Sequence, residues 1–308
     1  MIQYTIGYLR PLVSRTYHAG SFFHLIIGTI WLRPYVFLFL LVYLLAATTD
    51  WGWRRAGLFT LVAWTVAFAA EFASTRIGVP FGLYHYVEAT RGQELWIANV
   101  PLMDSLSFVF LAYASYATAR LLLAPETLGM VEDGGLLPAA ARRPAVLGLA
   151  VALFVLIDVI IDPVALRGDR WFLGRIYFYP DGGTYFGVPL SNFVGWGVVG
   201  YTILVLFTRM EGMVGGARPS WAANFPMCRW LGAGLYGGVL CFMVMVSWMI
   251  EERGLFLVNA CLTAVFAAGV VLRVAGHPYR AAAQRASPGN VGGFNTERES
   301  RRVPSLRG

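Results

Sequence analysis

The sequence predicts an all-α protein, a polytopic membrane helical bundle of about seven transmembrane helices with a weak internal repeat. Of its 308 residues, 57% are hydrophobic and only 13% are charged, whereas about a quarter of the residues in a soluble domain are charged. Apolar runs of about 20 residues, long enough to cross the hydrocarbon core of a bilayer, recur along the chain. We therefore expect an integral protein of a bacterial inner (cytoplasmic) membrane.

Three regions are predicted along the chain. Residues 1–33 form an N-terminal segment, whose apolar stretch is too short to span a bilayer and is expected to be interfacial. Residues 34–275 form the transmembrane domain. Residues 276–308 are rich in Arg, Ser and Gly, and such a tail is predicted to be disordered because it buries little apolar surface. The predicted spans are Pro34–Thr49, Ala56–Thr75, Ile97–Leu123, Pro144–Leu166, Gly187–Phe207, Arg229–Ile250 and Gly254–Leu272.

The net charge of +7 comes entirely from arginine. Nucleic-acid binding is the first interpretation of such a charge, but the arginines are concentrated in short loops and in the tail. The loops after spans one, three and five, with the adjoining span ends and the tail, hold about 15 of them. The positive-inside rule places the richer side in the cytoplasm. The basic charge is therefore attributed to membrane topology, and no nucleic-acid partner is expected.

Two helices open with similar segments. Val100-Pro-Leu-Met-Asp104 opens span three, and Val188-Pro-Leu-Ser-Asn192 opens span five. We interpret this as a weak two-helix repeat, with chance similarity as the alternative. Membrane proteins with internal repeats often place a site where the repeats meet.

Several acidic residues fall within predicted spans, where an ionisable group costs about 2.5–3.5 kcal/mol on insertion scales. Glu71, Asp158 and Asp162 lie toward the ends of spans two and four. Asp104 and Asn192 lie about one turn into spans three and five, entering from the same side of the membrane. Alternating topology therefore predicts that these five side chains converge at one depth.

Asp158 and Asp162 are four residues apart, so they share one helix face. Two carboxyl groups in a low-dielectric site cannot both ionise cheaply, so one is expected to keep its proton. An enzyme that protonates an unactivated alkene needs such an acid. The alternative is that these residues cap the helix or pair with arginines of the next loop.

The loop Gly78-Val-Pro-Phe-Gly-Leu-Tyr-His-Tyr86 combines a turn with closely spaced aromatic residues. Aromatic rings suit an apolar polyene and also stabilise a carbocation, although an aromatic belt at the membrane interface is the alternative interpretation. The four histidines form no ligand pair, so no metal or cofactor is expected. The candidate substrate-binding residues are Phe81, Tyr84, His85, Tyr86, Asn99, Tyr185 and Asn192.

Three segments of the sequence are distinctive: Glu71–Tyr86, Asn99-Val-Pro-Leu-Met-Asp104 and Tyr185–Asn192. In these segments the chain resembles the membrane carotenoid biosynthesis proteins. These include CruF-type carotenoid 1,2-hydratases and haloarchaeal bacterioruberin-precursor hydratases. The resemblance implies cofactor-free addition of water across the terminal double bond of an acyclic (ψ) carotenoid end, as in lycopene or gamma-carotene. The implied partners are a membrane-dissolved carotenoid and other carotenoid biosynthesis enzymes.

The residues suggest a mechanism for this hydro-lyase chemistry. A protonated Asp158 or Glu71 would give its proton to the alkene, aromatic side chains such as Tyr84 and Tyr86 would hold the tertiary cation, and a water held by Asp104 or Asn192 would add to it. A carotenoid end-group cyclase or isomerase would use the same acid and exclude water. A proton-coupled membrane transporter also fits several buried carboxyl groups.

Overall fold

The structure is a computed structural model that describes residues 22–129, 136–215, 218–224 and 230–286. The chain divides into two units, residues 1–267 and 268–308. Residues 1–21 and 287–308 lie outside the described residues, whereas residues 22–32 and 276–286 of the two predicted terminal segments belong to helices. The interfacial N-terminal segment and the disordered tail stay predictions.

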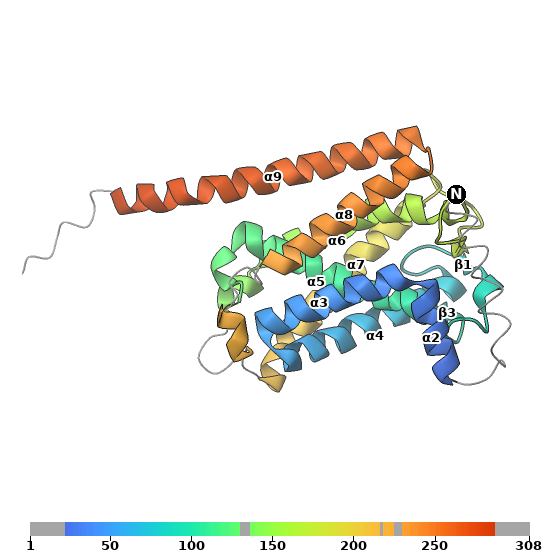
Figure 1. Ribbon diagram of the computed structural model, residues 1–308, viewed down its shortest axis with the longest axis horizontal. Helices are drawn as coiled ribbons and strands as arrows, with labels where there is room; N and C mark the ends of the chain where they lie inside the picture. The colour runs from blue at the N-terminus through green and yellow to red at the C-terminus, as the bar shows by residue number, and fades with distance from the viewer. Residues whose placement is uncertain (1–21, 130–135, 216–217, 225–229, 287–308) are drawn as a thin grey trace, which may run out of the picture. The chain divides into compact units, whose positions relative to one another are not determined.

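Helices dominate the described residues (Figure 1). Seven of them are long and apolar enough to cross a membrane, which confirms the predicted all-α polytopic bundle. The helices are α2 (Phe22–Leu32), α3 (Pro34–Trp51), α4 (Trp53–Ile77), α5 (Leu102–Leu123), α6 (Pro144–Ala165), α7 (Leu190–Val214), α8 (Leu231–Met249) and α9 (Arg253–Ala286). Short 3-10 turns are η1 (Glu88–Thr90), η2 (Pro125–Thr127), η3 (Ala139–Arg142), η4 (Gly168–Arg170) and η5 (Ser220–Asn224).

Helix α5 lies at the centre of the first unit. Its spanning window is 78% buried, while the windows of α3, α4, α6, α7 and α8 are 39–44% buried. Helices α3, α4, α6 and α8 pack directly against α5, and α7 packs against α4 and α6. A helix surrounded in this way is usually apolar on all sides, so the polar residues Asp104 and Ser105 in its first turn need a separate explanation.

Short strands join the loops at one end of the bundle. Strand β1 (His85–Tyr86) pairs antiparallel with β4 (Tyr177–Phe178), and β2 (Trp96–Ile97) pairs with β3 (Val100–Pro101). Figure 1 shows β1 and β3 at the same end as α2. The prediction that span three begins at Ile97 was wrong, because this segment forms the β2–β3 hairpin and α5 begins at Leu102.

The predicted repeat has counterparts in the backbone. Pro101 and Pro189 each precede the first residue of a helix, α5 and α7, in extended conformations (φ −66°, ψ 132° and φ −73°, ψ 145°). The loops before these helices are the ones that pair through β1 and β4. The pairing therefore brings the polar first turns of α5 and α7 to the same end of the bundle.

The opposite end of the bundle contains two buried ion pairs. Arg55 Nε lies 2.8 Å from Glu211 Oε2, and Arg120 Nη1 lies 2.6 Å from Asp50 Oδ2. Both arginines are 0% exposed. The prediction placed the arginines in short loops and in the tail, but these two lie inside the bundle because each is neutralised by a carboxylate.

Candidate functional site

Four carboxyl groups and one amide meet at the end of the bundle where β1 and β4 pair. They come from four helices: Glu71 from α4, Asp104 from α5, Asp158 and Asp162 from α6, and Asn192 from α7. Hydrogen bonds link them into two groups. The convergence expected from alternating topology is therefore present in the structure.

The first group joins Glu71 to Asp104. The hydroxyl of Tyr86 lies 2.5 Å from Asp104 Oδ2 and 3.0 Å from Glu71 Oε1. Ser105 donates a hydrogen bond to the other oxygen of Glu71, and the hydroxyls of Tyr84 and Tyr86 are 3.3 Å apart. One phenol of the β1 loop thus bridges two carboxyl groups of different helices.

The second group joins Asp158 to Asp162. Asn192 Nδ2 donates to Asp158 Oδ2 and to Asp162 Oδ2, both at 2.8 Å. Tyr177 and Tyr179 donate to the two oxygens of Asp162 at 2.9 and 3.2 Å. Asp158 Oδ1 is buried and has no hydrogen-bond partner among the described residues.

The bridging phenols lie in the loops outside the helices. Burial raises the pKa of Tyr84, Tyr86 and Tyr177, and the nearby carboxyl groups raise it further. The pKa of Tyr179 is raised for the same reasons. All four phenols therefore keep their protons at neutral pH and can act as hydrogen-bond donors.

No arginine pairs with the four carboxyl groups in the described part of the chain. Buried charges are usually paired or bind a metal, and the described residues contain no group of three or more His, Cys, Asp or Glu side chains arranged to hold a metal ion. In such surroundings protons remove the excess negative charge at lowest cost. The cluster is therefore suited to holding and transferring protons.

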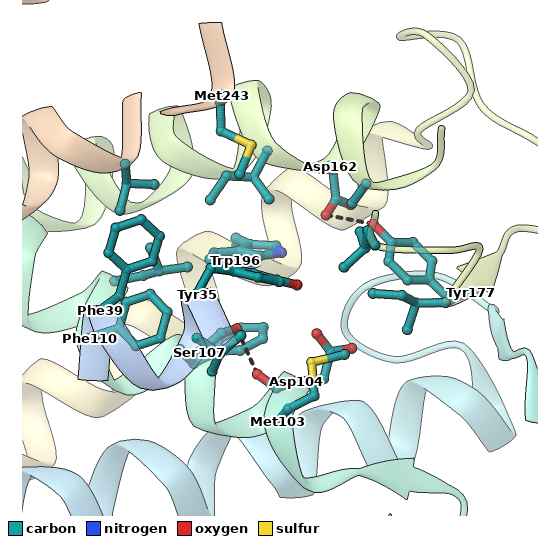
Figure 2. A pocket seen from close by; sticks show the side chains of 18 of the residues that line it. Tyr35, Phe39, Met103, Asp104, Ser107, Phe110, Asp162, Tyr177, Trp196 and Met243 are labelled. Carbon is teal, nitrogen blue, oxygen red and sulfur yellow. Dashed lines mark hydrogen bonds between the residues drawn. The ribbon is translucent and has the colours of Figure 1, made fainter. Parts of the chain in front are cut away.

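Two adjoining cavities border the cluster. The larger, about 100 Å³, is lined mainly by apolar and aromatic side chains of α3, α5, α6, α7 and α8. Figure 2 shows Phe39 and Phe110 at one end of it, Asp162 and Tyr177 at the other, and Tyr35 and Trp196 between them. The smaller, about 40 Å³, has a more polar lining that includes Glu71 and Asn192.

The two cavities share part of their walls. The residues that line both are Asp104, Phe108, Asp162, Tyr177 and Trp196. The rings of Phe108 and Trp196 stack with centroids 4.3 Å apart. An apolar ligand in the larger cavity would therefore lie against this aromatic pair with two carboxyl groups beside it.

The other sequence-predicted residues differ in how close they lie to these cavities. Phe81 and Tyr84 line the smaller cavity. His85 is exposed and packs on Phe178. Asn99 donates to Thr75 Oγ1 at 2.8 Å, and Tyr185 packs against Phe186 and Phe193. His85, Asn99 and Tyr185 line neither cavity.

Five contributors were absent from the predicted set of site residues: Ser105, Phe108, Tyr177, Tyr179 and Trp196. Trp196 lies one helical turn after Asn192, so the i, i+4 spacing on α7 carried a signal for it. Ser105 directly follows Asp104, but nothing local indicates that it faces Glu71. Tyr177 reaches Asp162 only because β4 pairs with β1, a contact that no local pattern specifies.

Comparison with known proteins places the chain in a family. The profile of a carotenoid biosynthesis protein family matches residues 32–270. The chain belongs to this family. It is 29% identical over 213 residues to a bisanhydrobacterioruberin hydratase of Haloarcula japonica, a match that covers 67% of this chain and 64% of the relative. The chain thus matches less than two thirds of that relative's length.

No solved structure matches the chain. The carotenoid biosynthesis family and the seven apolar helices together describe an integral membrane protein of carotenoid metabolism. Both carboxyl groups of α6 and the polar first turn of α5 lie within the matched segment.

Proposed function

We propose that this protein is a carotenoid hydratase, which adds water across the terminal double bond of an acyclic carotenoid end. The observation that carries the proposal is the junction of an aromatic-lined cavity with a carboxyl cluster that has no paired cation in the described residues. The name of the Haloarcula japonica relative supports hydration as the reaction class.

The size of the larger cavity fits one end of such a substrate. A cavity of about 150 Å³ holds benzene, so about 100 Å³ suits a group of about five carbons, the size of one prenyl end. Apolar and aromatic side chains line most of it, which favours a hydrocarbon ligand delivered from the membrane. A bulky cyclised end group fits this space less well.

The proposed chemistry follows from the carboxyl cluster on one side of the substrate and the aromatic-lined cavity around it. A protonated carboxyl group of the cluster gives its proton to the less substituted carbon of the double bond, which leaves a tertiary cation. The stacked rings of Trp196 and Phe108 stabilise this cation through their π faces. Water from the polar side adds to it, and the lost proton returns to the cluster. No cofactor takes part in this proposed sequence.

The decisive experiment is to express the protein in a bacterium that accumulates lycopene and to analyse the pigments by chromatography and mass spectrometry. A product heavier by one water, which carries the label from ¹⁸O-water, is the expected result. A new product of unchanged mass would instead indicate a cyclase or isomerase.

Unchanged lycopene would be followed by tests with gamma-carotene and with longer acyclic carotenoids. Failure with all of them, with the protein present in the membrane, would refute hydration and leave the proton-coupled transporter as the leading interpretation. Proton uptake into proteoliposomes would then be measured.

A further inference from the structure

The four carboxyl groups differ in their access to a ligand. Asp104 and Asp162 line both cavities, Glu71 lines only the smaller one, and Asp158 lines neither. A prenyl end in the larger cavity can therefore touch Asp104 and Asp162 but not the other two. Sequence reasoning chose Glu71 or Asp158 as the acid, and the cavities favour a different assignment.

The smaller cavity has the properties of a water site. A water molecule needs about 10–15 Å³ of such space and two to four polar partners, and this cavity offers about 40 Å³. Its polar lining includes carboxyl oxygens, the amide of Asn192 and the phenols of Tyr84 and Tyr179. Because it shares the walls of Asp104 and Asp162 with the larger cavity, water held there lies next to the prenyl site.

The number of hydrogen-bond donors around Asp162 indicates that this carboxyl group is ionised. It accepts three hydrogen bonds, from Tyr177, Tyr179 and Asn192. All three groups are donors here, because the phenols are protonated and an amide nitrogen only donates. Several donors directed at one carboxyl group stabilise its ionised form, so Asp162 is suited to accept a proton.

The same counting places a proton on the Glu71–Asp104 pair. The Tyr86 hydroxyl has one hydrogen, yet it contacts both carboxyl groups. If Tyr86 donates to Asp104, a protonated Glu71 donates to Tyr86. If Tyr86 donates to Glu71, a protonated Asp104 donates to Tyr86. Moving from the first arrangement to the second transfers the proton from Glu71 to Asp104.

We propose that Asp104 is the general acid and Asp162 the general base of the hydration, with the nucleophilic water held in the smaller cavity. This assignment rests on the proposed function. Asp104 gives its proton to the less substituted alkene carbon, and the π electrons form the new C–H bond. Water oxygen then bonds to the tertiary cation, and Asp162 takes the proton that this water loses.

The proton balance closes within the cluster. Asp162 ends the reaction protonated and Asp104 ionised, so one proton returns across the smaller cavity, whose walls include both groups. Glu71 lines this cavity, so a returning proton that enters at Glu71 restores the proton which Glu71 passes to Asp104 through the Tyr86 hydroxyl. Glu71 and Tyr86 thus act through Asp104 as positioning residues. Asp158 is a positioning residue that acts through Asn192.

The test uses wild-type and variant proteins in membranes supplied with lycopene in D₂O. Two quantities are measured by mass spectrometry: hydrated product, and deuterium in the recovered lycopene. Reversible protonation leaves deuterium in the alkene even when no water is captured. Asp104→Asn should lower both quantities at least 100-fold, the usual size of an acid–base contribution. Asp162→Asn should lower hydration similarly while deuterium still enters the lycopene.

Milder variants keep the proposal testable if either aspartate variant is missing from the membrane. The double variant Tyr177→Phe with Tyr179→Phe should raise the ratio of deuterium exchange to hydration. Tyr86→Phe should lower kcat, with little change in KM, and slow exchange together with hydration. Glu88→Gln is the control, because this exposed carboxylate pairs only with Arg91 among the described residues and should leave both quantities unchanged.

The outcomes separate the two proposals. Deuterium exchange that survives Asp104→Asn, or normal hydration in Asp162→Asn, overturns the assignment while hydration by the wild type still stands. If the wild type exchanges deuterium but forms no hydrated product, hydration is refuted, and loss of exchange in Asp104→Asn still supports Asp104 as the acid. If the wild type does neither, both proposals fail.

Discussion

Replacing Trp196 by leucine should lower the rate of the proposed hydration about 30-fold. Trp196 is 5% exposed, lines both cavities and stacks on Phe108 with centroids 4.3 Å apart. A cation over an indole in a desolvated site is stabilised by about 2 kcal/mol. Since 1.36 kcal/mol of activation free energy changes a rate tenfold, loss of the indole corresponds to that factor.

A graded series separates the electronic effect of this ring from its packing. Trp196→Phe keeps a π face and should retain more activity than Trp196→Leu. Both variants also lose packing against Phe154, so the amount of folded protein and its melting temperature are measured for each. Product formation per folded protein in lycopene-supplied membranes is the assay.

Trp64 provides the matched control. It stacks on Phe68 with centroids 5.5 Å apart but lines neither cavity, so Trp64→Leu should leave the rate per folded protein unchanged. Activity in Trp196→Leu above half of the wild-type value would refute the role of the indole. Equal losses in the phenylalanine and leucine variants would show that volume, not the π face, matters.

Three further predictions concern the cavity, the loop and the opposite end of the bundle. Val239→Phe should fill part of the larger cavity and raise the KM for lycopene. Val244→Phe should leave the KM unchanged, because Val244 lies on the side of α8 that faces another groove. Enzyme kinetics in detergent measure both variants. Gly195→Ala should cost about 1–3 kcal/mol of stability, because the new Cβ would lie 2.6 Å from Phe81 Cδ1. Gly197→Ala is the control, since its Cβ would meet only an ordinary contact at 3.7 Å. Thermal unfolding compares the two variants. Arg120→Met should lower the free energy of unfolding by about 3–5 kcal/mol, because it leaves the buried Asp50 carboxylate without a cation. Adding Asp50→Leu should restore much of that stability. Denaturant titrations measure both variants, and unchanged stability of the single variant would contradict the prediction.

The sequence predicted the helices well because a span is a local property. Twenty apolar residues in a row need no knowledge of their neighbours to be recognised, and α3 to α9 all follow from such runs. The ends of the helices were less predictable. Ile97 is as apolar as a helix residue, but it pairs with Val100 in a hairpin. Side-chain burial of Arg55 was missed because its partner Glu211 lies far away in the sequence.

The site was also predicted only in part, because some of its features are local in the sequence and others depend on contacts between distant segments. Carboxyl groups within apolar helices are conspicuous, and alternating topology sufficed to bring Glu71, Asp104 and Asp158 to one end. Their ranking by access to a ligand was not predictable. It depends on which helix faces meet, and on Tyr86 and Tyr177, whose positions are fixed by the pairing of β1 with β4.

If the two similar helix starts are a repeat, its two copies differ in a side chain at the site. Asp104 and Asn192 occupy equivalent positions at the starts of α5 and α7. The carboxyl group at position 104 lies within hydrogen-bond distance of Tyr86, which also contacts Glu71. An amide at position 192 supplies two hydrogens instead, one to Asp158 and one to Asp162. In the proposed mechanism, the carboxyl group at position 104 belongs to the proton donor, whereas the amide at position 192 directs hydrogens at Asp162, the proposed proton acceptor across the same cavity.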